Sequence, residues 1–116
     1  MKKKIADKWI KALRSGKYEQ TENALCKDGK YCCLGVLCEL AAKEKVCKIS
    51  KPDSNNIVSF DDNFGLIPRS VAWWSGMKSR DGKRKGKRKE LADLNDYSGY
   101  SFKRIANIIE KEYKDL

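Results

Sequence analysis

The residues best suited to bind an anionic ligand combine two indole rings with cationic side chains. They are Arg69, Trp73, Trp74, Lys78 and Arg80. Indole faces stack on nucleobases while guanidinium and ammonium groups pair with phosphate, as in nucleotide and single-strand binders. Because adjacent helical residues point about 100° apart, Trp73 and Trp74 cannot both face one core centre. The pattern predicts that at least one indole reaches the surface or a partner. The competing interpretation is a core tryptophan beside solvated charges.

A second set of polar side chains follows the first predicted helix and comprises Arg14, Lys17, Tyr18 and Gln20. A loop at the end of a helix can present such donors to a ligand or to a second subunit. Helix capping and local packing are the competing roles for the same residues. We therefore treat these residues as the second group of candidate ligand-binding residues.

Residues 78–89 form a strongly basic segment, with eight Lys or Arg side chains and one acid in a chain of formal net charge +10. Like charges repel, and a run with no apolar residue cannot bury surface to offset its ordering entropy. We therefore expect a flexible, solvated loop that either meets an anionic partner or only keeps the protein soluble. Its candidate nucleic-acid contacts are Lys83, Arg84, Lys85, Lys87, Arg88 and Lys89.

Five cysteines and the absence of histidine exclude several kinds of chemistry. The cysteines are Cys26, Cys32, Cys33, Cys38 and Cys47. An odd number of cysteines without a Cys-x-x-Cys pair argues for reduced thiols in the core, and a closed zinc site lacks its usual ligands. A Ser or Cys nucleophile also lacks its usual general base. We expect a non-enzymatic protein with no catalytic residue, no cofactor and no metal.

Apolar spacing predicts three helices that build the core, over about residues 2–15, 33–45 and 102–113. The middle helix is apolar around nearly its whole circumference, as expected of a central helix buried on most sides. Gly35 within that helix predicts the close approach of a neighbouring backbone. Ser101 is a good N-cap for the last helix.

Shorter elements are predicted from turn residues. Asp28-Gly29 between short apolar stretches is typical of a β-hairpin. Residues 46–50 and 57–60 are β-like runs that predict a second ribbon or an irregular excursion. Residues 68–76 predict a short helix that begins near a proline and ends near a glycine. Leu91 and Leu94 fit one more helical turn, and residues 95–99 read as a turn.

These elements predict one α+β domain over residues 1–116, mainly helical, with a buried central helix and short β-hairpins. A hydrophobic content of 41% in 116 residues supports a real core. No run approaches the ~20 apolar residues needed to span a bilayer. We therefore expect a soluble, cytosolic protein with no membrane partner.

Several segments resemble a family of small proteins encoded in bacteriophage and prophage genomes. They are Trp9, Ala12–Gln20, Tyr31–Leu40, Pro68–Gly76, Leu94–Asp96, Ser101–Phe102 and Ile105–Ala106. The Tyr-Cys-Cys-Leu-Gly-Val-Leu-Cys stretch is the most distinctive of them, whereas the basic segment is not part of the resemblance. The resemblance implies an accessory protein that works in a bacterial cytosol, and small phage proteins of this size often counter host defence.

Three classes of function remain. The first is a binder of an anionic ligand, most concretely a sponge that sequesters a (cyclic) nucleotide immune signal. The second is a nucleic-acid binder that uses residues 78–89 as an electrostatic arm, and the third is an inhibitor that docks on an acidic host protein. Sequence-independent DNA binders usually spread positive charge over a folded face, which favours the first class slightly. Whether protomers pair to build the pocket stays open.

Overall fold

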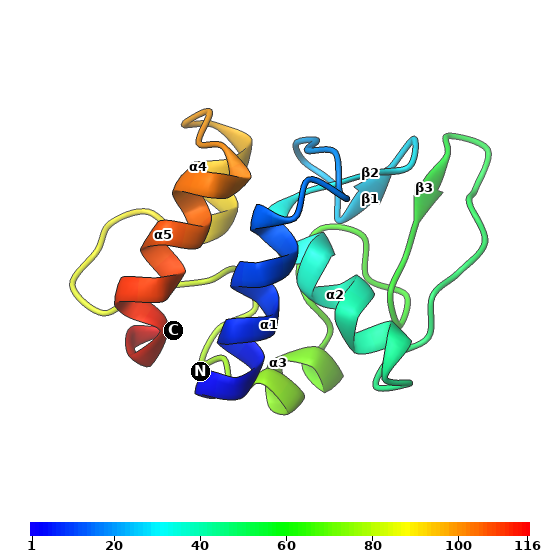
Figure 1. The fold of residues 1–116 in the computed structure, drawn as a ribbon. Helices are drawn as coiled ribbons and strands as arrows, with labels where there is room; N and C mark the ends of the chain where they lie inside the picture. The colour runs from blue at the N-terminus through cyan, green and yellow to red at the C-terminus, as the bar shows by residue number, and fades with distance from the viewer.

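Five α-helices and a small antiparallel sheet build the chain, whose computed structural model describes residues 1–116 (Figure 1). The elements are α1 (Lys3–Arg14), β1 (Cys26–Lys27), β2 (Lys30–Tyr31), α2 (Cys33–Lys43), β3 (Ile57–Val58), α3 (Arg69–Ser75), α4 (Leu91–Asp96), α5 (Phe102–Glu112) and the 3-10 helix η1 (Tyr113–Asp115). Helices and an antiparallel sheet share one hydrophobic core. The predicted α+β class is therefore confirmed.

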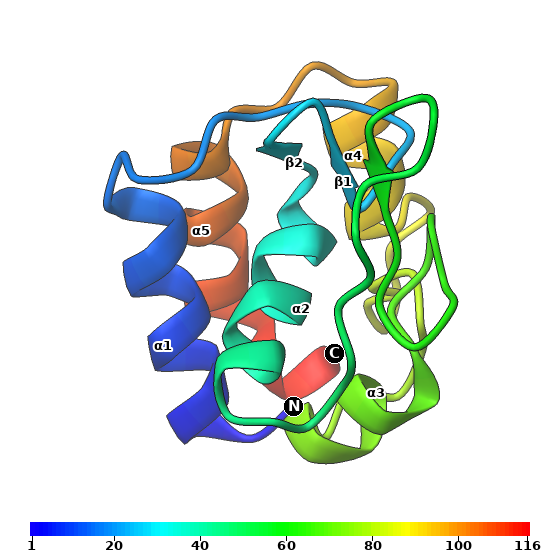
Figure 2. The same ribbon diagram turned by 90° about the vertical axis from the view of Figure 1, so that its right-hand side faces the viewer.

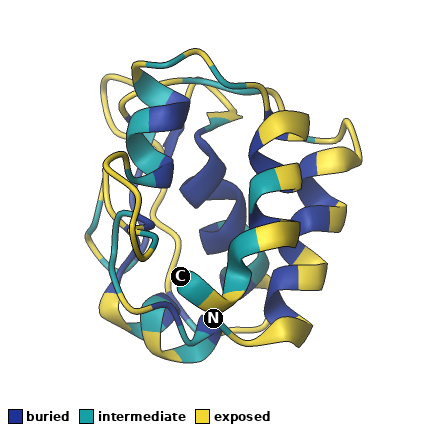
Figure 3. Cartoon of the chain, turned by 90° about the vertical axis from the view of Figure 1, so that its left-hand side faces the viewer, coloured by how far each residue is buried: buried dark blue, intermediate teal, exposed yellow.

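The central helix of the fold is α2, which contacts α1, α3 and α4 and is buried along its first two turns (Figure 3). Leu34, Val36 and Leu37 on this helix have no exposed surface. A Cβ atom built at Gly35 would lie 1.7 Å from the carbonyl oxygen of Leu25. Only glycine permits this approach, so the predicted close backbone contact is confirmed.

Helices α1 and α5 run side by side, and α1 also packs against α2 (Figure 2). On α1 the buried face includes Trp9, whose indole Nε1 donates a hydrogen bond to the carbonyl of Cys33 at 2.9 Å. On α5 the buried residues fall on one face, and the Ser101 hydroxyl accepts a hydrogen bond from the Arg104 amide at 3.2 Å. The predicted capping serine is therefore confirmed.

The hairpin of β1 and β2 turns at Asp28 and Gly29, which both have positive φ, as the sequence predicted. The predicted second ribbon forms in part. Residues 48–50 run antiparallel to residues 59–61, with backbone hydrogen bonds from the Ser50 amide to the Ser59 carbonyl at 2.9 Å and from the Asp61 amide to the Lys48 carbonyl at 2.8 Å, and with an isolated bridge between Ile49 and Phe60. Strand β3 itself pairs with β1. The edge of β1 that does not face β2 offers free backbone hydrogen-bonding groups, and β3 pairs with this edge. The turn predicted to begin at Asn95 is also displaced, because α4 continues to Asp96.

The basic segment, residues 78–89, contains no helix or strand, yet two of its arginines are held by the fold. The Arg80 guanidinium donates hydrogen bonds to the Ile67 carbonyl at 2.8 Å and to the Asn63 side chain. The Arg84 side chain is only 8% exposed and pairs with Glu112 at 2.6 Å. The expectation that all charges of the segment are solvated is therefore wrong for these arginines, because each finds acceptors within the fold.

Candidate anion-binding site

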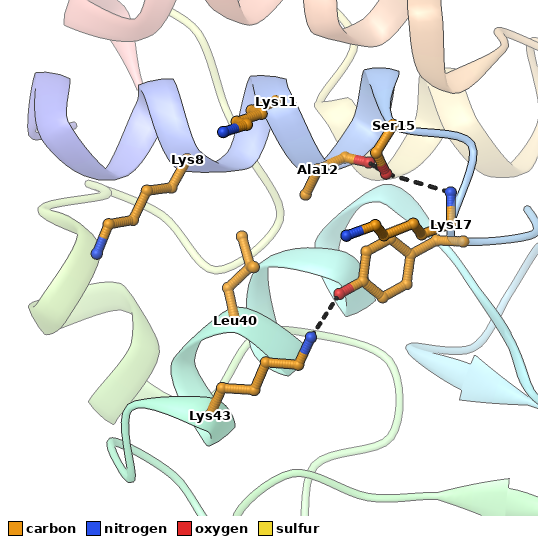
Figure 4. Close-up of a pocket in the computed structure, with 8 residues that line it drawn as sticks. Lys8, Lys11, Ala12, Ser15, Lys17, Leu40 and Lys43 are labelled. Carbon is orange, nitrogen blue, oxygen red and sulfur yellow. Dashed lines mark hydrogen bonds between the residues drawn. The ribbon is translucent and has the colours of Figure 1, made fainter.

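A basic pocket of about 270 Å³ opens between α1 and α2 (Figure 4). Four lysines, one tyrosine and one serine line it around two small or aliphatic side chains. The lining residues are Lys8, Lys11, Ala12, Ser15, Lys17, Tyr18, Leu40 and Lys43. Cations at the rim and an apolar floor suit a ligand that carries both an anionic group and an apolar part.

Helical periodicity and one turn bring these side chains together. On α1, Lys8, Lys11 and Ser15 are three and four residues apart and therefore lie on one face of the helix. The chain reverses at Gly16, which has a φ of 76°, and this reversal returns Lys17 and Tyr18 toward α2. The Ser15 hydroxyl donates to the Ala12 carbonyl at 2.6 Å and accepts from the Lys17 amide at 3.2 Å, so it fixes this turn.

The Tyr18 ring is held at the edge of the pocket by two neighbours. It packs edge-to-face on Tyr31, with ring centroids 5.2 Å apart. The Lys43 ammonium donates a hydrogen bond to the Tyr18 hydroxyl at 3.1 Å, and this bond raises the pKa of Lys43 above its ordinary value. An ordered aromatic ring therefore stands beside a fixed positive charge, an arrangement that suits a nucleobase carrying phosphate.

The charge of the pocket is not balanced within it. Lys8 forms an ion pair with Glu44 at 3.2 Å, and both side chains are about half exposed. Lys11, Lys17 and Lys43 form no ion pair with a carboxylate. Three ammonium groups around one cleft repel one another, and an anion between them relieves this repulsion.

The predicted tryptophan pair is divided between surface and core. Trp73 is 84% exposed, whereas Trp74 is half-buried and packs against the hydrophobic core. The expectation that at least one indole reaches the surface is confirmed. Arg69 is also exposed, at the start of the same helix. Arg69, Trp73 and Trp74 do not line the basic pocket between α1 and α2.

The other members of the first predicted group point elsewhere. Arg80 is turned inward toward Ile67 and Asn63, where its hydrogen bonds stabilise the loop before α3. The Lys78 ammonium donates to the carbonyl of Lys114 at 3.4 Å, near the C-terminal end of α5. The structure therefore does not gather the first predicted group into one pocket.

Within the second predicted group, Lys17 and Tyr18 line the basic pocket. The Arg14 guanidinium bonds Asn107 at 2.8 Å and both carboxylate oxygens of Glu110, and this pairing lowers the pKa of Glu110. The Gln20 amide donates to the Asn95 side chain and to the Tyr100 carbonyl, each at 2.8 Å. Arg14 and Gln20 thus tie the loop after α1 to α4 and α5.

Three lysines of the pocket, Lys8, Lys11 and Lys43, were not predicted from the sequence. Their spacing on the helices was visible, but a lysine row on a helix is equally typical of a solvated face. The missing information was that this row faces Tyr18 and the last turn of α2.

All five cysteines are free, buried thiols. Burial raises the pKa of Cys32 to about 12 and that of Cys47 to about 11. Such thiols remain protonated near neutral pH and pack as small apolar side chains. The chain contains no cluster of three Cys, Asp or Glu side chains arranged to hold a metal ion.

The fold and the pocket define a small α+β domain with a cationic surface cleft. The chain belongs to the family described as "Domain of unknown function (DUF8296)", whose family model matches residues 1–113. No curated protein and no solved structure matches the chain. None of the helices is both long enough and apolar enough to cross a membrane.

Proposed function

We propose that this protein binds a small phosphate-bearing ligand, a nucleotide, in the basic pocket between α1 and α2 without converting it. The main observation in support of this proposal is a set of three ammonium groups, on Lys11, Lys17 and Lys43. These groups have no carboxylate partner and lie beside the ordered ring of Tyr18. The lysines meet the phosphate, and the ring and the Leu40 side chain meet the base.

The size of the pocket limits the ligand. A volume of about 270 Å³ lies just below the range of roughly 300 to 1,000 Å³ that holds drug-sized ligands. A mononucleotide is the largest ligand that fits well. A cyclic di- or trinucleotide would place only one nucleotide unit in each pocket, so its full recognition would need a second copy of the chain.

The biological role that we propose is sequestration of a nucleotide immune signal in the cytosol of a phage-infected bacterium. The resemblance to phage-encoded proteins supports this role. The pocket lining holds no histidine or carboxylate that could activate a nucleophile, which supports binding rather than turnover. A protein of this kind lowers the free concentration of the signal in proportion to its own abundance.

Isothermal titration calorimetry with 5′-mononucleotides and with cyclic di- and trinucleotides tests the proposal. Loss of one ammonium–phosphate contact, in Lys11→Ala or Lys43→Ala, should weaken binding about tenfold, the effect of roughly 1.4 kcal/mol. Tyr18→Phe keeps the ring and should bind better than Tyr18→Ala.

Lys103→Ala is the matched control, because Lys103 is an exposed lysine on α5 that does not line the pocket. Its affinity should equal that of the wild type. Absence of heat with every nucleotide, or equal losses in Lys103→Ala and Lys43→Ala, would refute the pocket and would favour an inhibitor that docks on a host protein.

A further inference from the structure

One end of the molecule carries an exposed tryptophan beside cationic side chains. Trp73 on α3 has 84% of its surface exposed, the highest fraction among the large exposed hydrophobic residues. The Lys2 ammonium lies 5.7 Å from the centroid of its ring. The Lys2 amide also donates to the Ser75 carbonyl at 2.8 Å, so the start of α1 is fixed against the end of α3. An indole ring is thus presented to solvent on a rigid support.

The basic segment reaches the same end of the molecule. The Lys78 ammonium donates a hydrogen bond to the Lys114 carbonyl. Burial, together with the charge of Lys78, lowers the pKa of the nearby Met1 amino group. That amino group donates to the Leu116 carbonyl at 2.8 Å, so both chain ends and Lys78 lie together. Figure 1 shows α3, the two chain ends and the yellow loop that follows α3 along this end.

A second basic cleft, of about 370 Å³, lies within this surface. Lys78, Ser79, Lys83, Arg84, Lys85, Lys87 and Asp115 line it, and none of these residues is apolar. Five of the seven carry a positive charge and one a negative charge. Such a lining suits phosphate.

The cationic side chains of this cleft are displayed on an anchored backbone. Arg84 pairs with Glu112 at 2.6 Å and donates to the Lys89 carbonyl at 3.1 Å, while the Lys83 amide donates to the Ser79 hydroxyl at 2.7 Å. The segment therefore lies folded against the end of α5. Its positive charge is spread over a folded face, as in nucleic-acid-binding surfaces.

We infer that this end of the protein binds single-stranded nucleic acid, with phosphates on Lys78, Lys83 and Lys85 and a base stacked on Trp73. A lysine-lined cleft and an exposed indole on the same end of the molecule are the two components of non-specific single-strand sites. Only an unpaired base can offer its face to an indole, so the exposed ring selects single strands over duplex. The inference is independent of the proposed nucleotide pocket, because it uses none of the residues that line it.

Fluorescence anisotropy with a labelled oligothymidine of about 12 nucleotides, and with a duplex of equal length, tests this inference. The wild type should bind the single strand more tightly than the duplex. Trp73→Ala should weaken single-strand binding roughly 5- to 140-fold, which corresponds to about 1 to 3 kcal/mol at 1.4 kcal/mol per tenfold. The triple variant Lys78→Ser, Lys83→Ser and Lys85→Ser should flatten the log-log salt slope by about 2, at roughly 0.7 per single-strand phosphate.

The charge-matched control replaces three exposed lysines away from this end of the molecule, Lys27, Lys30 and Lys103, by serine. Its salt slope should stay within about 0.7 of the wild-type slope, because no phosphate contact is removed. Circular dichroism of Trp73→Ala checks that the fold is kept, as expected for a side chain 84% exposed.

Three results would overturn the inference. They are the absence of oligonucleotide binding at low salt, duplex binding as tight as single-strand binding, and an affinity that Trp73→Ala leaves unchanged. Binding to anionic phospholipid vesicles in place of the oligonucleotide would reassign the surface to a membrane. Lys43→Ala should not change the affinity for the oligonucleotide. The single-strand inference and the nucleotide-pocket proposal can therefore fail independently of each other.

Discussion

Gly35 shows how tightly a single residue can constrain this fold. Its α-carbon faces the carbonyl of Leu25, and the absent side chain allows the backbone before β1 to rest on α2. The Cys32 amide donates to that same carbonyl at 3.3 Å, and the Cys32 thiol accepts from the Gly35 amide at 3.3 Å. The entrance to α2 and the hairpin are therefore packed as one unit.

We expect Gly35→Ala to destabilise the protein by about 3 kcal/mol or more, because a methyl group 1.7 Å from a backbone oxygen forces the hairpin away from α2. Gly65→Ala is the matched control, since a Cβ at Gly65 meets no atom within 4 Å, and its effect should stay within about 0.5 kcal/mol. Urea denaturation measures both values. Equal stabilities for the two variants would contradict the close approach.

Among the elements, α3 is held in place by a carboxylate from the preceding loop. Asp61 accepts hydrogen bonds from the Lys48 amide at 2.8 Å and from the Ser70 hydroxyl at 2.6 Å. These bonds lower the pKa of Asp61 below its ordinary value of 3.8. The ionised carboxylate therefore connects the segment before β3 to the first turn of the helix that presents Trp73.

We expect Asp61→Asn to lower the free energy of unfolding by up to about 1 kcal/mol at pH 7, because the surface position weakens these charged hydrogen bonds. A lowered folded-state pKa means that the stabilisation is present above pH 3.8 and is lost as the pH falls through the lowered value. The difference between wild type and variant should therefore shrink below pH 3.8.

Denaturation at pH 7, 4 and 3 measures this pH dependence. Asp62→Asn is the control, since Asp62 shares the positive φ of Asp61 but is exposed and its side chain makes no hydrogen bond. A difference between wild type and Asp61→Asn that stays constant with pH would show that ionised Asp61 does not carry the effect.

At the scale of the whole molecule, the net charge of +10 is concentrated in two places, the pocket between α1 and α2 and the end where the chain termini meet. The Arg84–Glu112 pair fixes the second of these, because it joins the basic segment to the end of α5. The arginine side chain is 8% exposed and the glutamate 21%, so the pair is partly shielded from solvent. Removing it should release the segment from the fold.

We expect Arg84→Ser to cost about 1 to 3 kcal/mol, because Glu112 loses its charged hydrogen bond in a shielded position. Lys85→Ser, which removes an exposed charge from the next residue, should change stability by less than about 0.5 kcal/mol. Chemical denaturation at neutral pH compares the two. Equal effects would mean that the segment is not anchored through Arg84.

Local rules account for most of the elements that the sequence predicted. The spacing of apolar residues predicted α1, α2 and α5. Two turn residues with positive φ predicted the hairpin, and Ser101 predicted the start of α5. The need for a glycine at position 35 was also readable. Each of these features depends on residues close together in the chain, so their physical causes are present in the sequence itself.

The pairing of distant segments was decided only by the tertiary structure. A sequence pattern did not show that β3 would add to β1, or that Arg80 and Arg84 would turn inward. Asn95, read as a turn residue, is 1% exposed and accepts hydrogen bonds from Gln20 and the Cys33 amide. These contacts depend on which buried acceptor lies within reach after folding.

The candidate site, too, was decided only by the tertiary structure. The aromatic and basic residues of α3 and the basic segment were recognisable as binding chemistry, but only Lys17 and Tyr18 of the predicted residues line the basic pocket. Lys8, Lys11 and Lys43 have the spacing of any solvated helical face. They become a pocket because α1 packs against α2 at a distance and angle set by their buried faces, and the exposed lysines carry no information about that packing.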